Sequence, residues 1–352
     1  MNPPSLATEI ALIEKFFRDY RIGAAVHKRA SFMAGKSFAV LGVSLGPGTR
    51  ISALENRMPE MSEVLSGYRG IPTPLRLRKL PLAIEIPHPA AEPLFATAGN
   101  LHIPAHSMLL GKSFGYEGER DEVLRFDDAP HSLIAGTTGS GKSKLLELMI
   151  YTLAMNTSPH ELELVFVDLK NEELVPFADL PHTSAMALSL EDAEETIADV
   201  YARKNARVRT GRGKYKRLVL VIDELAEMSR SKAIMHQLAS ILAIGRSKAI
   251  NVLAATQKPT AGIVGSVAKA NFTARLVGKV MSPTDAEVAA GISGTQAHFL
   301  PGKGSFLFVY GDQTNRFQAY LQDAIDLAAI NERWMVQAAM LLDRGRETVK
   351  GQ

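Results

Sequence analysis

Eight residues near the middle of the chain constrain its fold and chemistry more than any other segment. They are Gly136-Thr137-Thr138-Gly139-Ser140-Gly141-Lys142-Ser143, and they match the pattern G-x-x-x-x-G-K-[ST] at every defined position. The apolar run at 131–135 predicts a buried strand before them, and residues 144–155 predict an apolar-faced helix after them. A strand, a glycine-rich turn and a helix in this order form a cradle for the phosphates of a nucleotide.

The residue types explain how this cradle would hold ATP and Mg²⁺. Glycines let the backbone turn its N–H groups toward the β-phosphate, and the helix N-terminus adds a partial positive charge. We expect Lys142 to reach the β- and γ-phosphates and Ser143 to ligate Mg²⁺. The alternative, a glycine-rich turn with an accidental Lys-Ser pair, is disfavoured by the flanking strand and helix. The residues expected to bind ATP are Gly136, Thr137, Thr138, Gly139, Ser140, Gly141, Lys142, Ser143 and Lys144.

A second Gly-Lys-Ser triplet, at 111–113, lacks the rest of the pattern. The pattern requires glycine five residues before Gly111, where the chain has His106. We therefore interpret this triplet as a turn and assign phosphate binding to residues 136–143 alone.

Composition excludes several classes of site and compartment. The chain has 352 residues, enough for two or three domains, and its apolar fraction of 46% and charged fraction of 22% are typical of soluble globular proteins. It has no cysteine, which excludes disulfides, thiolate zinc sites and cysteine nucleophiles. Its nine histidines show no metal-ligand spacing with carboxylates. No apolar run reaches about 18 residues and no signal peptide is visible, so we expect a cytoplasmic protein without a membrane span.

The pattern of apolar residues divides the chain into a small α+β domain at 1–95 and a larger α/β domain at 96–352. Three prolines between residues 87 and 93 mark a linker, and the apolar runs after it are separated by helices, which is typical of a parallel sheet covered on both faces. The elements expected in the first domain are helices at 5–22 and 59–68, a strand at 38–45, and a strand or strand pair at 75–86. Those expected in the second are strands at 162–168, 218–223, 250–256, 274–280 and 305–310 and helices at 190–206, 233–244 and 323–343.

Two carboxylates, Asp223 and Glu224, follow the apolar run of the strand that begins at residue 218. Because the carboxyl ends of parallel strands meet at one edge of a sheet, Asp223 is expected to lie beside the phosphate loop. There Asp223 can hold the Mg²⁺ shell, and Glu224 can polarise the attacking water. An apolar strand ending in Asp-Glu is common in proteins, so this assignment depends on the loop upstream. Together the two motifs predict ATP hydrolysis on a RecA-like core.

Two more polar residues end predicted strands at this edge. Gln257 follows the strand at 250–256, where its amide can contact the γ-phosphate or the attacking water, or can simply cap the strand. Asp168 ends the strand at 162–168 and is close to Lys170 in sequence. It either supports the site or forms a local salt bridge, and the sequence leaves both alternatives open.

These segments resemble the DNA-translocase motors of the FtsK/SpoIIIE class, within the FtsK–HerA superfamily. GVSLGPGTRISAL (42–54) and LAIEIPHP (82–89) resemble the family's smaller ring domain. The resemblance implies a RecA-like P-loop NTPase motor domain preceded by that small domain. The matching motor segments are PHSLIAGTTGSGKSK (130–144), VDLKNEELVPF (167–177), LVLVIDELAEM (218–228), ILAIGRSKAINVLAATQKPT (241–260), KANFTARLVGKV (269–280) and GISGTQAHFLPGKGSFLFV (291–309).

The resemblance further implies a hexameric ring that hydrolyses ATP between subunits and carries double-stranded DNA through its channel. A ring motor needs a cation from the neighbouring subunit to stabilise transition-state charge. Arg275 lies on the family's arginine-bearing strand, Arg246 is the second candidate, and a solvated surface arginine is the alternative interpretation. Relatives in division and sporulation carry membrane spans and a C-terminal winged-helix module. We expect no membrane span here, because no apolar run is long enough, and no winged-helix module, because the chain ends about 40 residues after the last predicted strand.

The segment RKNARVRTGRGKYKR (203–217) holds eight basic residues and no acidic one, although the net charge of the chain is only +3. Binding to DNA phosphates is driven by such charge and needs no base contacts. The alternative is a solvated basic loop. The residues expected to contact DNA are Arg207, Arg209, Arg212, Lys214 and Lys216.

Three functions are consistent with these observations. The first is an ATP-driven translocase of double-stranded DNA. The second is a protein-export ATPase of the same motor class, which would usually carry several tandem motor domains and membrane segments. The third is a P-loop protein that uses the nucleotide as a regulatory switch.

Overall fold

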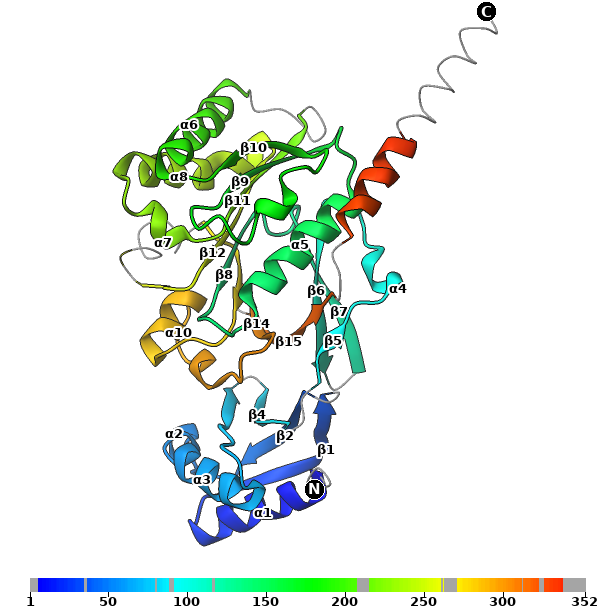
Figure 1. The fold of residues 1–352 in the computed structure, drawn as a ribbon. Coiled ribbons are helices and arrows are strands. Elements are labelled where there is room, and N and C mark those ends of the chain that lie inside the picture. The colour runs from blue at the N-terminus through cyan, green and yellow to red at the C-terminus, as the bar shows by residue number, and fades with distance from the viewer. Residues whose placement is uncertain are drawn as a thin grey trace, which may run out of the picture.

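The fold is described from a computed structural model of the chain (Figure 1). In the described part of the chain, the strands form a four-stranded sheet and an 11-stranded sheet. Among these residues no helix is both long and apolar enough to cross a membrane. The described residues are 6–34, 37–79, 81–88, 92–115, 118–207, 215–260, 262, 271–311, 313–322 and 326–337.

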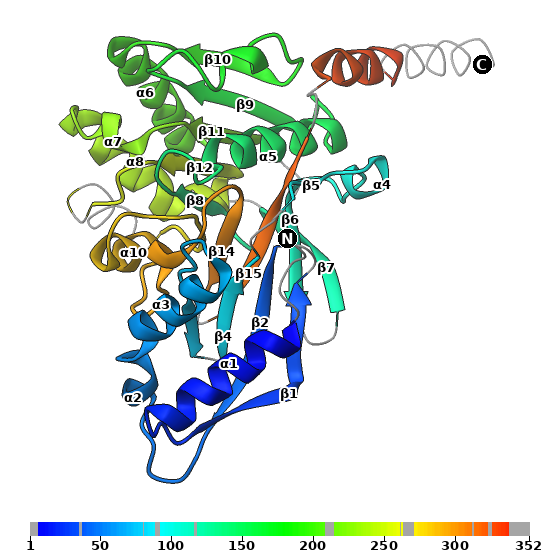
Figure 2. The same cartoon turned by 60° about the horizontal axis from the view of Figure 1, so that its bottom comes forward.

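The small sheet is antiparallel and carries its helices on one face. Its strand order is β1 (Ala24–Ala34), β2 (Phe38–Leu45), β4 (Leu82–Pro87) and β3 (Arg76–Lys79). The helices are α1 (Leu6–Asp19), α2 (Ile51–Glu55) and α3 (Met58–Arg69). Figure 2 shows them in front of the sheet, on the face turned away from the rest of the molecule.

Apolar residues at helical spacing attach these helices to the sheet. Ile10, Ile13 and Phe17 lie on one stripe of α1 and are buried against the strands, together with Met61 of α3 and Leu41 of β2. The expected helices and the strands at 38–45 and 75–86 are confirmed. β1 was not expected, because charged residues in its middle interrupt the alternation of apolar and polar side chains that marks a strand. Its pairing with β2 also shifts register at this point.

The large sheet combines a parallel and an antiparallel half. Its order is β10-β9-β11-β12-β8-β13-β14-β15-β6-β7, with β5 beside β15. The six strands from β10 to β13 pair in parallel, and the remaining pairs along this order are antiparallel. The bounds are β5 (Leu94–Phe95), β6 (Ser107–Gly115), β7 (Gly118–Arg125), β8 (His131–Ala135), β9 (Leu162–Val167), β10 (Thr183–Ala187), β11 (Arg217–Ile222), β12 (Ile250–Thr256), β13 (Ala274–Val277), β14 (Ser305–Tyr310) and β15 (Gln313–Leu321).

Helices cover both faces of the parallel half, as the sequence predicts. Leu164 and Phe166 of β9 pack on the side of α5, whereas Val165 and Val167 pack on the side of α6 and α8. This alternation follows the two-residue period of a strand. The bounds are α4 (Ala98–Leu101), α5 (Lys142–Asn156), η1 (Val175–Phe177), α6 (Leu190–Ala206), α7 (Leu225–Met228), α8 (Lys232–Ile244), η2 (Gly245–Lys248), α10 (Pro283–Ala290), η3 (Ala297–Phe299) and a further helix at 327–337.

The helix at 327–337 packs against α5 through Trp334. The indole Nε1–H of Trp334 donates a hydrogen bond of 2.9 Å to the carbonyl oxygen of Ala154. A closing helix is therefore confirmed within 327–337. The rest of the expected range, 323–343, lies outside the described residues except for residue 326, which is not helical.

The second Gly-Lys-Ser triplet lies in strand β6, so its interpretation as a turn is wrong. Gly111 pairs with Ala319 of β15 and with Glu122 of β7. A Cβ atom on Gly111 would lie 2.1 Å from the carbonyl oxygen of Gln318. The glycine therefore permits a close approach of two backbones beside a β-bulge, which sequence reasoning mistook for a turn signal.

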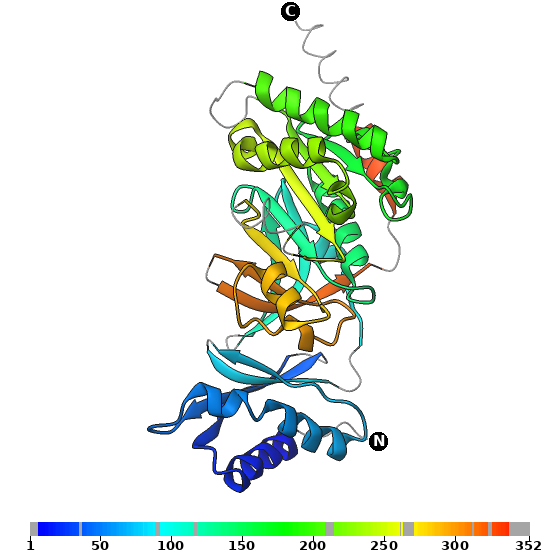
Figure 3. The same ribbon diagram turned by 90° about the vertical axis from the view of Figure 1, so that its left-hand side faces the viewer.

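A buried ionic cluster joins the small sheet to the large one. The Glu85 carboxylate of β4 accepts from Arg76 at 2.8 Å and from Arg316 of β15 at 2.9 Å. The Arg76 Nε–H also donates to the carbonyl oxygen of Thr295 at 2.9 Å. Figure 3 shows the small sheet between its own helices and the α10 end of the large sheet. The boundary expected at residue 95 stays a prediction.

This cluster makes stability depend on pH in a defined range. Burial raises the pKa of Glu85, but the charges of Arg76 and Arg316 outweigh it and hold the pKa at about 2, below its ordinary value of 4.5. A lowered pKa in the folded state stabilises the fold above about pH 4.5 and loses that contribution as the pH falls toward 2.

We expect Glu85→Gln to remove about 3 kcal/mol of stability near neutral pH, because two buried arginines lose their counter-charge. The difference in urea midpoint between wild type and variant should shrink as the pH falls from 4.5 toward 2. The matched control is Glu60→Gln, which changes an exposed pair with Arg57 and should leave the midpoint almost unchanged. A difference that stays constant across this pH range would contradict the assignment.

Candidate active site

Backbone contacts hold the phosphate loop between β8 and α5. Gly139 and Gly141 adopt φ angles of 78° and 96°, which glycine reaches without strain. The turn before β14 packs against the loop: the Lys303 N–H donates to the Gly139 oxygen at 2.9 Å, and the Gly304 N–H donates to the Ser140 oxygen at 2.8 Å. A Cβ atom on Gly141 would lie 2.8 Å from the Gly304 nitrogen, so this position requires glycine.

The first residues of the loop are tied to the neighbouring strands. The Gly136 N–H donates to the Thr256 oxygen at the end of β12, and the Thr137 N–H donates to the Lys279 oxygen after β13. Lys142 begins α5, so the loop ends at the positive end of a helix dipole. The residues expected to bind ATP thus form the turn 136–141 and the first residues of α5, at the carboxyl edge of the parallel strands. Their role in binding stays a prediction.

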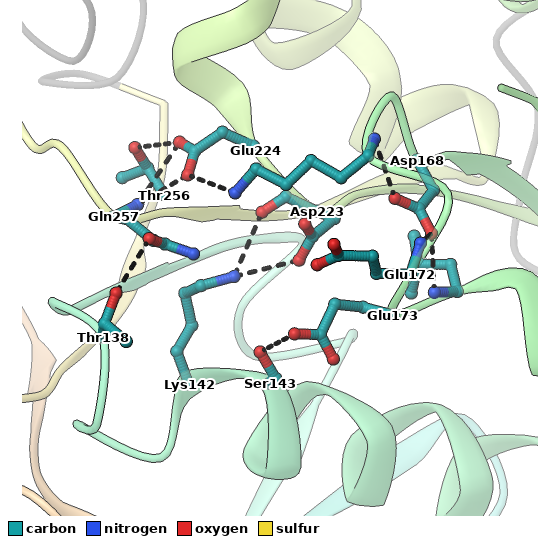
Figure 4. A network of polar contacts seen from close by, with 12 residues as sticks. Thr138, Lys142, Ser143, Asp168, Glu172, Glu173, Asp223, Glu224, Thr256 and Gln257 are labelled. Carbon is teal, nitrogen blue, oxygen red and sulfur yellow. Dashed lines mark hydrogen bonds and ion pairs between the residues drawn. The ribbon is translucent and has the colours of Figure 1, made fainter. Parts of the chain in front are cut away.

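Lys142 and Asp223 form a buried ion pair (Figure 4). The Lys142 Nζ lies 2.9 Å from the Asp223 Oδ1 and 3.3 Å from the Asp223 carbonyl oxygen, and both side chains are buried. Sequence reasoning placed these residues at the same sheet edge, and the structure brings them into contact. The carboxylate neutralises the ammonium that the phosphates of ATP would otherwise neutralise.

Glu224 is held by the end of β12. Its carboxylate accepts from the Thr256 hydroxyl at 2.7 Å and from the Gln257 N–H at 3.0 Å. It also accepts from the Ala226 N–H at 3.3 Å and so caps the short helix α7. The Lys170 ammonium lies 3.8 Å from the Glu224 carboxylate. The expected base is therefore buried and fixed in orientation.

The Gln257 side chain faces the phosphate loop. Its Oε1 accepts a hydrogen bond of 3.3 Å from the Thr138 hydroxyl. Its backbone N–H contacts Glu224, so Gln257 connects the loop to the expected base. This placement agrees with contact to a γ-phosphate or to the attacking water.

Asp168 organises the loop that follows β9. Its two carboxylate oxygens accept from the backbone N–H groups of Lys170, Asn171, Glu172 and Leu174 at 2.9 to 3.3 Å. The Lys170 ammonium lies against Glu224, so the local salt bridge is not the role of Asp168 here. Asp168 thus fixes the backbone of this loop, and its support of the site stays a prediction.

Sequence reasoning missed Glu173, which this loop delivers to the phosphate loop. The Ser143 hydroxyl donates a short hydrogen bond to the Glu173 Oε1 (Figure 4). Part of the signal was available, because Glu172 and Glu173 closely follow the carboxyl end of β9. It was overlooked because strand order is not visible in one sequence.

The residues present fit a magnesium ion. Ser143 and Asp223 supply the hydroxyl and carboxylate oxygens that Mg²⁺ prefers, beside a loop shaped for phosphate. In the described part of the chain, no group of three or more His, Cys, Asp or Glu residues could hold a metal by itself. A Mg²⁺ ion here would therefore depend on phosphate oxygens and water for its remaining ligands.

Arg275 does not fit a cation supplied to a neighbouring subunit. Its side chain is only 5% exposed and lies in β13. Its guanidinium donates to the carbonyl oxygens of Val288 and Ala289 at 3.2 Å, at the C-terminus of α10. An arginine at the negative end of a helix dipole stabilises that helix. The sequence pattern could not show which side of the strand this side chain occupies.

The residues expected to contact DNA are only partly described. Arg209, Arg212 and Lys214 lie outside the described residues. Lys216 is exposed before β11. The Arg207 guanidinium donates to the carbonyl oxygens of Lys248 and Ala249 at 2.8 and 3.1 Å, so it attaches the end of α6 to η2.

The mixed sheet and the phosphate loop together define an α/β protein of the P-loop NTPase class. Residues 105–210 match the model of the FtsK/SpoIIIE family. The chain therefore carries an FtsK/SpoIIIE-family domain, and the resemblance inferred from its motifs is confirmed.

Curated relatives support this assignment along most of the chain. A DNA translocase FtsK of Corynebacterium efficiens is 26% identical over 369 residues, covering 94% of this chain and 38% of the relative. A DNA translocase FtsK of Leptospira interrogans is 30% identical over 300 residues, covering 76% of this chain and 30% of the relative. The chain thus spans about a third of the length of the curated relatives it matches.

Solved structures confirm the fold. The pCW3 conjugation coupling protein TcpA, in its monomer form with ATPγS, gives a TM-score of 0.62 at 18% identity, covering 92% of this chain and 99% of that chain. EssC (ATPases 2 and 3) from Geobacillus thermodenitrificans gives a TM-score of 0.60 at 19% identity, covering 73% of this chain and 53% of that chain. The predicted α/β motor fold is therefore confirmed.

Proposed function

We propose that the chain is an ATPase motor that moves along double-stranded DNA. The observation that carries this proposal is the convergence of Lys142, Ser143, Asp223, Glu224 and Gln257 at one sheet edge of an FtsK/SpoIIIE-family domain. Relatives named DNA translocase FtsK supply the expectation of a DNA substrate.

The residues of the site would divide the chemistry as follows. Lys142 would contact the β- and γ-phosphates in place of the Asp223 carboxylate, and Asp223 and Ser143 would then hold the Mg²⁺ shell. Glu224 accepts the proton of the attacking water. Gln257 lies between Thr138 and Glu224, where it orients that water or senses the γ-phosphate. When bound, Mg²⁺ neutralises the charge that develops on the phosphates.

The proposal includes a homo-oligomeric ring, expected to be a hexamer, with ATP between subunits. Because Arg275 is buried in its own subunit, Arg246 becomes the first candidate for the cation supplied to the neighbour. Arg246 is exposed, and its guanidinium donates to the backbone carbonyl oxygen of Asp127 at 3.1 Å. A motor of this kind acts on chromosomal or plasmid DNA, so we also propose a cytoplasmic location.

The function is tested by measuring ATP hydrolysis with long linear duplex DNA, with short duplex DNA, with peptides and with no polymer. We expect turnover to rise with long duplex and to stay at its basal level with peptides. Stimulation by peptides and not by DNA would favour the protein-export alternative. Nucleotide binding without stimulated turnover would favour a regulatory switch.

Charge reversal in the segment 203–217 should weaken the response to DNA. A variant with Arg209→Glu, Arg212→Glu and Lys214→Glu is expected to bind DNA with a weaker dependence on salt. The slope of log affinity against log salt concentration should become less steep by about 1 for each DNA phosphate that the variant no longer neutralises. The measurement is fluorescence anisotropy of a labelled duplex at several salt concentrations. The control is Lys232→Glu at the exposed start of α8. An unchanged slope in the triple variant would remove this segment from the binding surface.

A further inference from the structure

The loop between β9 and η1 has a fixed shape and ends against the phosphate loop. Asp168 is fully buried and accepts four backbone N–H groups of this loop. Asn171 takes a φ angle of 59°, in the left-handed region that asparagine tolerates better than most residues. A loop tied to one buried carboxylate presents its side chains in a defined direction, so the backbone itself places Glu173 at Ser143.

The hydrogen bond between Ser143 and Glu173 determines how the serine hydroxyl is oriented. A serine hydroxyl has one proton and two lone pairs. The Ser143 proton is donated to the Glu173 Oε1, so the lone pairs of the hydroxyl oxygen remain available to a cation. Without this acceptor the hydroxyl could donate elsewhere, for example to a carbonyl of the preceding turn, and its lone pairs would no longer be fixed.

We infer that Glu173 is a positioning residue for magnesium, which acts by holding the Ser143 hydroxyl in the orientation that binds the metal. The inference rests on the proposed function, since it concerns the same nucleotide site. Residues that orient a metal ligand typically affect metal affinity by about 10- to 100-fold when they are removed. A carboxylate in this position also raises the electron density of the hydroxyl oxygen that donates to it, which favours a hard cation.

The test measures magnesium dependence of nucleotide binding and needs no turnover. A fluorescent, non-hydrolysable ATP analogue is titrated with wild type and with Glu173→Ala, which removes the acceptor of the Ser143 hydroxyl, in EDTA and over a range of Mg²⁺ concentrations. We expect the Mg²⁺ concentration for half-maximal binding to rise at least about 10-fold in the variant. Affinity in EDTA should stay within twofold of wild type, which also shows that the variant is folded.

Further variants sharpen the result. Glu147→Ala removes the same charge from the turn of α5 that follows Ser143, where Glu147 pairs with Lys144, and should leave the Mg²⁺ midpoint unchanged. Ser143→Ala combined with Glu173→Ala should cost no more than Ser143→Ala alone, because both act through one hydroxyl. Glu173→Asp keeps the charge but withdraws it from Ser143, so it should behave like Glu173→Ala and covers the case in which that variant does not fold.

The outcomes separate this inference from the proposed function. If wild type binds no nucleotide, the proposed function fails. If wild type binds with a clear Mg²⁺ dependence but Glu173→Ala has the wild-type midpoint, the inference is overturned while the function stands. An equal loss of affinity in EDTA and in Mg²⁺ would also overturn it, because Glu173 would then support the loop and not the metal.

Discussion

Lys142→Ala should lower ATP turnover by about a thousandfold, because it removes a preorganised cation from the phosphates. The structure adds a second effect that the motif alone does not predict. Lys142 is the partner of Asp223, and both are buried. Removing one member of a buried ion pair leaves the other charge uncompensated and typically costs about 3–5 kcal/mol. We therefore expect the variant to be destabilised as well as inactive.

The double variant Lys142→Ala, Asp223→Asn separates these two effects. Removing both charges should recover most of the thermal stability, whereas turnover should stay at background. Lys112→Ala is the matched control, since it alters the lysine of the other Gly-Lys-Ser triplet, which pairs with Glu119 on the antiparallel part of the sheet. Turnover near the wild-type rate in a folded Lys142→Ala protein would refute the phosphate-loop assignment.

Glu224→Gln should lower turnover by about 10²- to 10⁴-fold while nucleotide binding is retained, because an amide cannot accept the proton of the attacking water. The glutamine Oε1 can still accept from the Thr256 hydroxyl, so the side chain should keep its place at the end of β12. Its NH₂ group replaces an oxygen that accepts from the Gln257 N–H, which removes one hydrogen bond. A motor with this substitution is expected to trap ATP and stall on DNA.

The measurements are single-turnover hydrolysis with nucleotide in limiting amount and retention of labelled duplex after ATP is added. Glu227→Gln, in the same short helix, is the control, because Glu227 pairs with Arg230 away from Glu224. If Glu224→Gln kept the DNA-dependent turnover of wild type, Glu224 would not be the base and the proposed mechanism would fail.

Local backbone requirements and burial made the central part of this site predictable. The phosphate loop is a single segment whose glycines and lysine stand at fixed positions, so its residues could be named before any contact was known. The strands β11 and β12 were found because parallel strands covered on both faces give continuous apolar runs. The positions of Asp223 and Gln257 were predictable because the carboxyl ends of parallel strands lie at the same edge of a sheet.

Contacts between distant segments were not predictable. The position of Arg275 in β13 was clear, but only packing shows that its side chain reaches the end of α10. Gly111 was interpreted as a turn residue, because the strand that approaches it, β15, lies more than two hundred residues further along the chain. The strand β1 and the hairpin β6–β7 were missed for a different reason, because their exposed polar residues weaken the alternation that marks a strand.

The sequence by itself determined the class of the protein, the segment that would hold phosphate, and the pair of carboxylates at the sheet edge. These features depend on short segments whose chemistry is complete within a few residues. Only the tertiary structure decided that Lys142 forms an ion pair with Asp223, that Ser143 donates a hydrogen bond to Glu173, and that Glu85 connects the two sheets through Arg316. Each of these contacts joins residues far apart in the chain, so it depends on strand order and packing, which no local pattern contains.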